Sequence, residues 1–189
     1  MIETNRLLLR PFQEGDEQDL FEYLNEPMVH CFVCMKVNTV VEAQKAVLER
    51  AKEPQLYFAI VEKVSGKVIG EIDAHPETSR PDAAENMQMD TFSPCWMLNN
   101  NYQGKGYAYE AACAFFDYLF QEKGARRIYA YTEDYNRSSQ HLCEKLGMRR
   151  EGLHIEFVTF VNDEEGNPIY ENTYQYAILK KEWEARKCG

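Results

Sequence analysis

Residues 99–108 read NNNYQGKGYA, and they join an apolar, strand-like segment (89–98) to the most regular helical pattern in the chain. Gly104 and Gly106 lack the Cβ atoms that would keep a ligand away from the backbone. A loop of this kind can point successive N–H groups into one concavity, and the helix N-terminus that follows favours an anion. Lys105 adds a full positive charge. The stretch therefore predicts a phosphate site, with a glycine turn that only packs strand against helix as the alternative.

Two common phosphate loops do not fit this stretch. The dinucleotide-binding fingerprint G-x-G-x-x-G/A needs a small residue three positions after its second glycine, where this chain has Tyr109. The P-loop string G-x-x-x-x-G-K-S/T does not occur. A nucleotide-dependent enzyme is kept as an alternative that a cofactor competition assay would separate.

The segments around the loop alternate between strand and helix patterns. An apolar stripe at helical spacing follows it, and Gly124 is expected to end that helix. Further helices are expected after Asp16, from about 40 to 52 and from 137 to 146, and the tail after Lys181 is expected to be polar and irregular. Strands are expected at 6–12, 56–64, 67–74, 89–98, 127–132, 156–161 and 169–179.

This order predicts an α+β fold, in which hairpins at both ends flank a βαβ crossover. We expect one domain over residues 1–189, with a mixed, mostly antiparallel sheet of about seven strands and helices on both faces. The polar stretch 76–88 contains two prolines and no periodicity, so it is predicted to be a long loop with a functional role.

Composition excludes several classes of protein. The chain has 44% hydrophobic and 28% charged residues, which is typical of a folded domain. Its net charge of −10 argues against nucleic acid as a partner and suits a cationic substrate, although such a charge can also serve solubility alone. No apolar run approaches the ~18 residues of a membrane span, and residues 1–6 carry no signal core, so we expect a cytoplasmic location and no membrane partner.

The six cysteines show no disulfide framework. Cys31 and Cys34 form a lone CxxC beside His30, and a zinc site would need a second ligand pair at suitable spacing. We therefore expect reduced thiols and no metal.

The glycine loop also belongs to a wider pattern. Residues 103–108 (QGKGYA) match Q/R-x-x-G-x-G/A, the pyrophosphate signature of the GCN5-related N-acetyltransferase (GNAT) family. Four further segments resemble its ribosomal-protein N-terminal acetyltransferase (Rim-like) branch in the expected order. They are ETNRLLLRPF at 3–12, VIG at 68–70, NRSS at 136–139 with EKLGM at 144–148, and YAIL at 176–179 with Glu182-Trp183.

The resemblance implies a GNAT fold that binds acetyl-CoA as cosubstrate. The pyrophosphate would lie on the backbone amides of Gln103, Gly104, Lys105, Gly106, Tyr107 and Ala108. The pantetheine arm would pair like an extra strand with Trp96, Met97 and Leu98, where this strand splays from the one at 127–132. Asn136 would hydrogen-bond the pantetheine, and Lys105 and Arg137 would contact the remaining phosphates, although Arg137 fits a solvated surface residue equally well.

The implied reaction is acetyl transfer to a primary amine, a protein N-terminus or a small molecule, directly within a ternary complex. An alkylammonium with a pKa of about 10.4 cannot attack until a base takes its proton. Glu71, Asp73 and His75 alternate along one strand face, and among them we favour Glu71 as the base. All three can equally form an exposed polar face, and Glu156 is a further candidate.

A proton donor to the leaving thiolate is harder to assign. Many relatives have a Tyr seven residues after the Asn, but this chain has Cys143 there, which fits a small buried residue better. Ser139 matches the family's helix serine and is our candidate, with cofactor orientation or helix capping as its alternatives. An acyl-cysteine route through Cys34 or Cys143 lacks a paired base.

The acceptor site is expected in residues 27–38, in the 76–88 loop and in the C-terminal hairpin, with Met28, Phe32, Met35 and Phe92 as pocket or core residues. Because family members are often dimers, the resemblance also implies a homodimer. The alternative function is a CoA-binding sensor or adaptor with this fold and no turnover.

Overall fold

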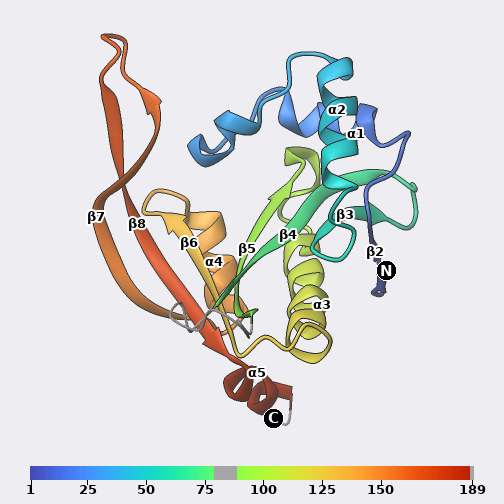
Figure 1. Cartoon of the computed structure of the whole chain (residues 1–189), viewed down its shortest axis with the longest axis vertical. Helices are drawn as coiled ribbons and strands as arrows, with labels where there is room; N and C mark the ends of the chain where they lie inside the picture. Colours follow the sequence, from blue (N-terminus) through green and yellow to red (C-terminus); the bar gives the residue numbers. More distant parts are fainter. Residues whose placement is uncertain (79–88, 188–189) are drawn as a thin grey trace.

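The computed structural model describes residues 1–78 and 89–187. Over these ranges it contains one sheet of eight strands, in the order β1-β2-β3-β4-β5-β6-β8-β7 (Figure 1). All neighbouring strands pair antiparallel except β5 and β6, which are parallel. The predicted α+β class, with a mostly antiparallel sheet, is confirmed.

The strands are β1 (Ile2–Glu3), β2 (Leu7–Arg10), β3 (Tyr57–Glu62), β4 (Val68–Thr78), β5 (Met89–Leu98), β6 (Arg127–Glu133), β7 (Arg149–Asn162) and β8 (Pro168–Leu179). The α-helices are α1 (Glu17–Leu24), α2 (Val40–Arg50), α3 (Tyr107–Gln121), α4 (Arg137–Lys145) and α5 (Lys180–Lys187). Two short 3₁₀ helices, η1 (His30–Met35) and η2 (Asn100–Tyr102), complete the described elements.

Four boundaries differ from the expectation. The two-residue strand β1 was missed, and β4 continues to Thr78 because it pairs with β5 as far as Met89. The rest of the predicted loop, 79–88, lies outside the described residues. β7 begins at Arg149 rather than at residue 156, and the predicted irregular tail is helix α5.

Helix α5 is stabilised by the packing of Trp183 against helix α3. Its ring lies 5.5 Å from that of Phe116 and 6.1 Å from that of Phe120, and its Nε1 donates to Asp117 Oδ1 at 2.6 Å. One buried tryptophan in a charged octapeptide gives no helical periodicity, so the sequence pattern could not predict this helix.

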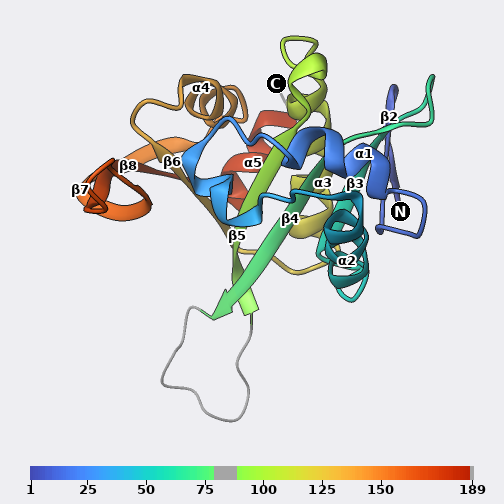
Figure 2. The same ribbon diagram turned by 90° about the horizontal axis from the view of Figure 1, so that it is seen from above.

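Two apolar clusters cover the two faces of the sheet. One contains the buried stripe of α3 (Ala111, Ala112, Phe115, Phe116 and Leu119) together with Leu142 of α4. The other contains Leu20 and Leu24 of α1 and Val47 of α2. The helices therefore lie on both faces of the sheet (Figure 2), as expected.

The parallel strands β5 and β6 separate almost at once. Their only paired positions are Thr91 with Arg127 and Phe92 with Ile128. Pro94, two residues further along, has no N–H to donate. From here to the end of β5 the side of the strand that faces β6 is unpaired, and this is the splay that the sequence analysis anticipated.

Two segments frame the splay on one face. The β7–β8 hairpin extends well beyond the rest of the sheet (Figure 1). Between α1 and α2 the chain carries η1 across to contact β7 (Figure 2). Glu156 in β7 has φ 48° and lies where the pairing with β8 shifts between His154 and Val158.

Gly70 is required where β4 meets β5. A Cβ built on it would lie 2.2 Å from the carbonyl oxygen of Met97 and 2.9 Å from Cα of Leu98. We expect Gly70→Ala to lower the free energy of unfolding by about 3 kcal/mol or more, because two backbones must move apart. In Gly152→Ala, where the added Cβ meets nothing within 4 Å, the change should be below about 1 kcal/mol. Urea denaturation of both variants measures this, and equal stabilities would contradict it.

Candidate functional site

A cavity of about 830 Å³ occupies the splay. It runs from the N-termini of α3 and α4, between β5 and β6, to η1 and β7. Most of the predicted cofactor residues line it, namely Trp96, Met97, Leu98, Gln103, Gly104, Gly106, Tyr107, Ala108, Asn136 and Ser139. Lys105 and Arg137 do not. Met28, Phe32 and Met35 line the other end, whereas Phe92 is core.

The glycine loop is shaped for backbone contacts. Gly104 has φ 73° and Gly106 has φ 80°, left-handed conformations in which side chains are strained. Among the described residues, no group accepts a hydrogen bond from the N–H groups of Gly104, Lys105 or Gly106. The first amides of α3 also lack helical partners. The loop thus offers a run of free donors at the positive end of a helix.

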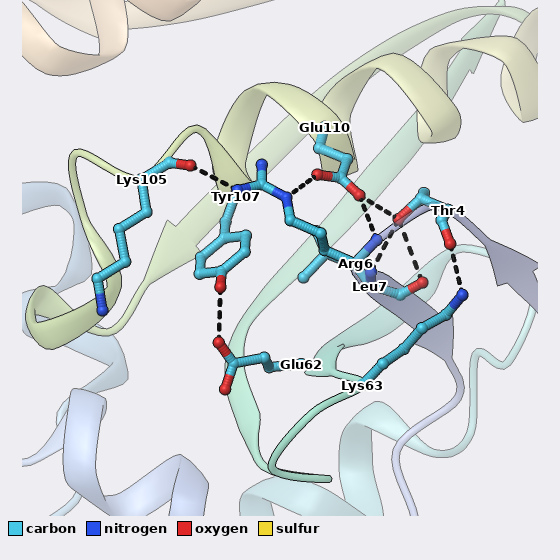
Figure 3. Close-up of polar contacts among 8 residues, drawn as sticks. All are labelled: Thr4, Arg6, Leu7, Glu62, Lys63, Lys105, Tyr107 and Glu110. Carbon is cyan, nitrogen blue, oxygen red and sulfur yellow. Dashed lines mark hydrogen bonds and ion pairs between the residues drawn. The ribbon is translucent and has the colours of Figure 1, made fainter.

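The N-terminal segment holds this loop in place (Figure 3). Nη1 of Arg6 donates to the carbonyl oxygen of Lys105 at 2.9 Å, and its Nε donates to Glu110 Oε2 at 2.6 Å. The backbone N–H of Arg6 and the hydroxyl of Thr4 both donate to Glu110 Oε1, at 2.8 and 2.6 Å. Arg6 therefore links the loop backbone to the first turn of α3.

The same contacts keep Glu110 charged. Burial opposes the charge, but the hydrogen bonds from Thr4 and Arg6 outweigh it and lower the pKa of Glu110. The guanidinium of Arg6 also lies 4.5 Å from the ring centre of Tyr107, whose hydroxyl donates to Glu62 Oε1 at 2.6 Å (Figure 3). Arg6 is part of the sequence motif at 3–12, but the motif does not indicate this contact, because the partners of Arg6 lie about a hundred residues further along the chain.

Asn136 organises the start of α4. Its Oδ1 accepts from the N–H of Ser139 at 3.2 Å, and its Nδ2 donates to Glu133 Oε2 at 3.1 Å. The Oγ of Ser139 accepts from Trp96 Nε1 at 3.2 Å across the slot. Ser139 therefore stands beside β5 with its own hydroxyl hydrogen free to donate elsewhere.

Metal-binding clusters, disulfides and membrane-spanning helices are all absent from the described part of the chain. Within residues 1–78 and 89–187, no group of three or more His, Cys, Asp or Glu side chains is arranged to hold a metal ion. The five cysteines in these ranges are free thiols. None of the helices described is long and apolar enough to cross a membrane.

Comparison with known proteins decides the family. The family model for the acetyltransferase (GNAT) domain matches residues 6–149, which is most of the chain. The chain belongs to the GNAT family of acetyltransferases. It is therefore an N-acetyltransferase, and the acetyl donor used by the family is acetyl-CoA.

Individual relatives agree with this family over nearly the whole chain. The uncharacterized N-acetyltransferase YnaD of Bacillus subtilis is 32% identical over 182 residues, which are 96% of this chain and 98% of YnaD. The crystal structure of a GNAT-family acetyltransferase from Bacillus anthracis has a TM-score of 0.80 at 29% identity, covering 96% of this chain and 99% of that one. Ribosomal-protein-S5-alanine acetyltransferase from Vibrio fischeri shares the fold, with a TM-score of 0.71 at 20% identity, over 96% and 97% of the two chains.

Glu71, predicted as the base of this GNAT enzyme, is buried and does not line the cavity, and the same is true of Asp73. Its two carboxylate oxygens accept from Nε and Nη2 of Arg50, both at 2.9 Å. The hydroxyls of Tyr23 and Tyr57 donate to it at 2.9 and 3.1 Å. The Glu71 carboxylate thus already accepts four hydrogen bonds, two of them from a guanidinium, and these fix its position. The prediction for Glu71 gains no support from this geometry.

Asp73 lies on the same strand face in a different environment. Burial, followed by the negative charge of Glu71, raises the pKa of Asp73 to about 7. Its Oδ1 receives no hydrogen bond from the described residues and lies 3.5 Å from Nε2 of the exposed His75. Asp73 pairs across the ladder with Cys95, which lines the cavity.

The other candidates occupy less suitable places. Glu156 is exposed on the β7 bulge and does not line the cavity. Burial raises the pKa of Cys143 to about 12, so it holds its proton too tightly to act as an acid near neutrality. Arg137 is exposed and donates to Gln140 Oε1 at 3.2 Å, while Nζ of Lys105 lies 4.9 Å from the ring centre of Tyr102. The phosphate contacts of these two cations stay predictions.

We expect Arg6→Lys to weaken acetyl-CoA binding about tenfold, because lysine keeps the charge but cannot contact the Lys105 carbonyl and Glu110 together. Arg126→Lys is the matched control, because it alters another arginine ion pair, Nε to Asp90 Oδ2 at 3.1 Å, away from the loop. Calorimetric titration gives both dissociation constants. Equal affinities in Arg6→Lys and wild type would show that the loop does not need this link.

Proposed function

We propose that this GNAT enzyme transfers the acetyl group of acetyl-CoA directly to a primary amine within a ternary complex. The single observation behind this proposal is the separation of β5 from β6 after Phe92, which opens into a cavity that ends at the glycine loop. Bound acetyl-CoA supplies an activated acetyl thioester with a good leaving group. What remains is to hold the two substrates and to move protons, which side chains of this chain can do.

The residues present fit acetyl-CoA. The free amides of the loop suit a pyrophosphate, and a Cβ on Gly104 would point into open space rather than into protein. The unpaired side of β5 at 96–98 suits an amide-containing arm that adds to it like a strand. Asn136, fixed by Glu133 and by the N–H of Ser139, would be held ready beside that arm.

Ser139 is our candidate for assisting the leaving group. Because its Oγ already accepts from Trp96, its O–H is oriented away from that indole and can donate to a sulfur in the slot. This donation would stabilise negative charge that develops on the leaving thiolate.

For the proton on the acceptor amine we propose Asp73 in place of Glu71. A base works best when its pKa lies near the working pH, and the value of about 7 for Asp73 meets that condition. The ammonium would lose one proton to this carboxylate, and the free pair of the amine would attack the thioester carbon. As the C–S bond breaks, a second proton from the nitrogen would go to the leaving sulfur, which leaves as CoA thiol. Glu71 would act by holding Arg50, Tyr23 and Tyr57 in place beside Asp73.

Partner and location remain predictions. The exposed apolar residues of the β7–β8 hairpin, among them Ile155 and Phe157, are where a homodimer contact should be sought first. A cytoplasmic location is still expected from the sequence.

Acetyl-CoA and CoA, but not NAD or ATP, should raise the melting temperature by roughly 5 to 10 °C at ~100 times the dissociation constant. Gly106→Trp should abolish the shift, because its side chain would fill the loop. Gly66→Trp introduces the same bulk at a similar φ of 71° in the β3–β4 turn and should keep the shift. Acetylation of an amine panel then separates the enzyme from a CoA sensor, which would show the shift without turnover.

The rate should follow the ionisation of Asp73. We expect kcat to rise with pH through about 7 as this carboxyl loses its proton. In Asp73→Asn this rise of kcat with pH should disappear and kcat should fall about 100-fold. In His75→Gln the rise should remain. Folding raises this pKa, so the wild type should also lose stability as pH rises from the ordinary value of 3.8 to about 7, and Asp73→Asn should not. An unchanged pH–rate profile in Asp73→Asn would remove Asp73 from the reaction.

A further inference from the structure

Two buried carboxylates, Glu133 of β6 and Glu171 of β8, are not used by the proposed chemistry. Glu133 and Glu171 are each 6% exposed. The β6–β8 ladder pairs Glu133 with Thr173, and Glu171 lies two residues before Thr173 on the same face of β8. Glu133 and Thr173 both line the cavity.

Little positive charge faces these carboxylates. His30 contacts Glu171 through Nδ1, and the hydroxyl of Tyr135 donates to the other oxygen at 3.2 Å. Glu133 has the amide of Asn136 and the thiol of Cys31 as partners, neither of which is a cation. Among the residues described, no lysine or arginine forms an ion pair with either glutamate. A buried carboxylate without a cation is costly, so the site is suited to receive one.

A second and independent observation also points to a missing ligand. Thr173 is 3% exposed, and its Oγ1 has no hydrogen-bond partner among the described residues. Buried hydroxyls normally have partners, because leaving one unpaired costs roughly 1–3 kcal/mol. An ammonium group carries three N–H donors and could satisfy the Glu133 carboxylate and the Thr173 hydroxyl together.

The reacting amine is not the group that suits this place. A carboxylate within a few ångströms stabilises an ammonium and raises its pKa, whereas the attacking nitrogen must be neutral. Asp73 pairs across the β4–β5 ladder with Cys95, and Cys95 and Glu133 both line the cavity. The proposed base therefore lies beside the β5 wall of the cavity and Glu133 on its β6 wall, so one carboxylate serves proton removal and the other a charge that persists.

Between these polar ends the wall is apolar. The rings of Tyr131 and Phe157, 5.3 Å apart, line the cavity beside Glu133, with Phe160 further along. Rings of this kind pack well against methylene groups and against cations. The occupant therefore has an apolar stem as well as a charge.

We propose that Glu133 and Thr173 bind a second, non-reacting ammonium group of the acceptor, which makes the preferred substrate a linear aliphatic diamine or polyamine. This inference rests on the proposed acetyl transfer and adds the substrate class. Glu133 and Thr173 are binding residues that select this substrate, and Glu171 strengthens the negative potential from behind.

The test compares each diamine with the monoamine of equal length: 1,4-diaminobutane with butylamine, 1,6-diaminohexane with hexylamine and 1,8-diaminooctane with octylamine. A short peptide with a free N-terminus is included. For at least one pair we expect kcat/KM to favour the diamine by about tenfold or more, well beyond the factor of two that two equivalent amines give. Glu133→Gln should reduce the ratio toward two, and Thr173→Val should reduce it in part. Glu164→Gln removes the same charge from the exposed β7–β8 turn and should leave it unchanged.

The ratio isolates the proposed subsite. Both amines share the acetyl-CoA step, so any effect of Glu133→Gln on Asn136 cancels. A ratio near two for every pair in the wild type, or a high ratio that survives in Glu133→Gln, overturns the subsite and leaves acetyl transfer standing. Acetylation of the peptide with none of the diamines overturns it as well. If the wild type acetylates no amine, the proposed function fails and the subsite with it.

Discussion

Beyond Phe92 and Ile128, the parallel strands β5 and β6 exchange no further hydrogen bonds. Backbone N–H and C=O groups in the middle of a sheet need partners, and an eight-stranded sheet that opens at its centre leaves a row of them without any. The crossover helix α3 joins the end of β5 to the start of β6, so its N-terminus stands at the open end of the gap. A groove with hydrogen-bonding walls and a positive helix end is the direct consequence of this one divergence.

The two sides of the gap between β5 and β6 carry different polar groups. On the β5 side, Glu71 of β4 forms a buried ion pair with Arg50 of α2, and Asp73, next along the same face of β4, has a carboxyl whose pKa lies near neutrality. On the β6 side, Glu133 of β6 and Thr173 of β8 line the cavity, and among the described residues no lysine or arginine forms an ion pair with Glu133. Burial alone does not decide how such acids behave. Glu71 accepts hydrogen bonds from a guanidinium and two phenols, whereas Asp73, two residues away, has one carboxylate oxygen, Oδ1, without a hydrogen-bond partner among the described residues.

Local sequence patterns were sufficient where one element carries its own signal. The α3 stripe, the β3–β4 hairpin and the glycine loop are each contained in a short stretch, and all three are where the pattern put them. The features that no local pattern indicated depend on residues that are distant in the sequence. Helix α5 needs Phe116 and Phe120 of α3. The hydrogen bonds of Glu71 need Arg50 of α2, and the pairing of Glu133 with Thr173 needs a strand forty residues on. Periodicity within one element does not report contacts between distant elements, so the glycine loop was predictable from the sequence, whereas the contacts of Glu71 and of Glu133 were not.

The contacts of Arg6 also constrain how the loop is made. Its hydrogen bonds to Glu110 join positions 104 residues apart in the chain. During synthesis Arg6 can therefore reach Glu110 only after more than half of the chain has been made. Closing so long a loop is slow relative to forming local hairpins. The link that fixes the glycine loop is thus completed late in folding, once Arg6 near the start of the chain has met Glu110 in its middle.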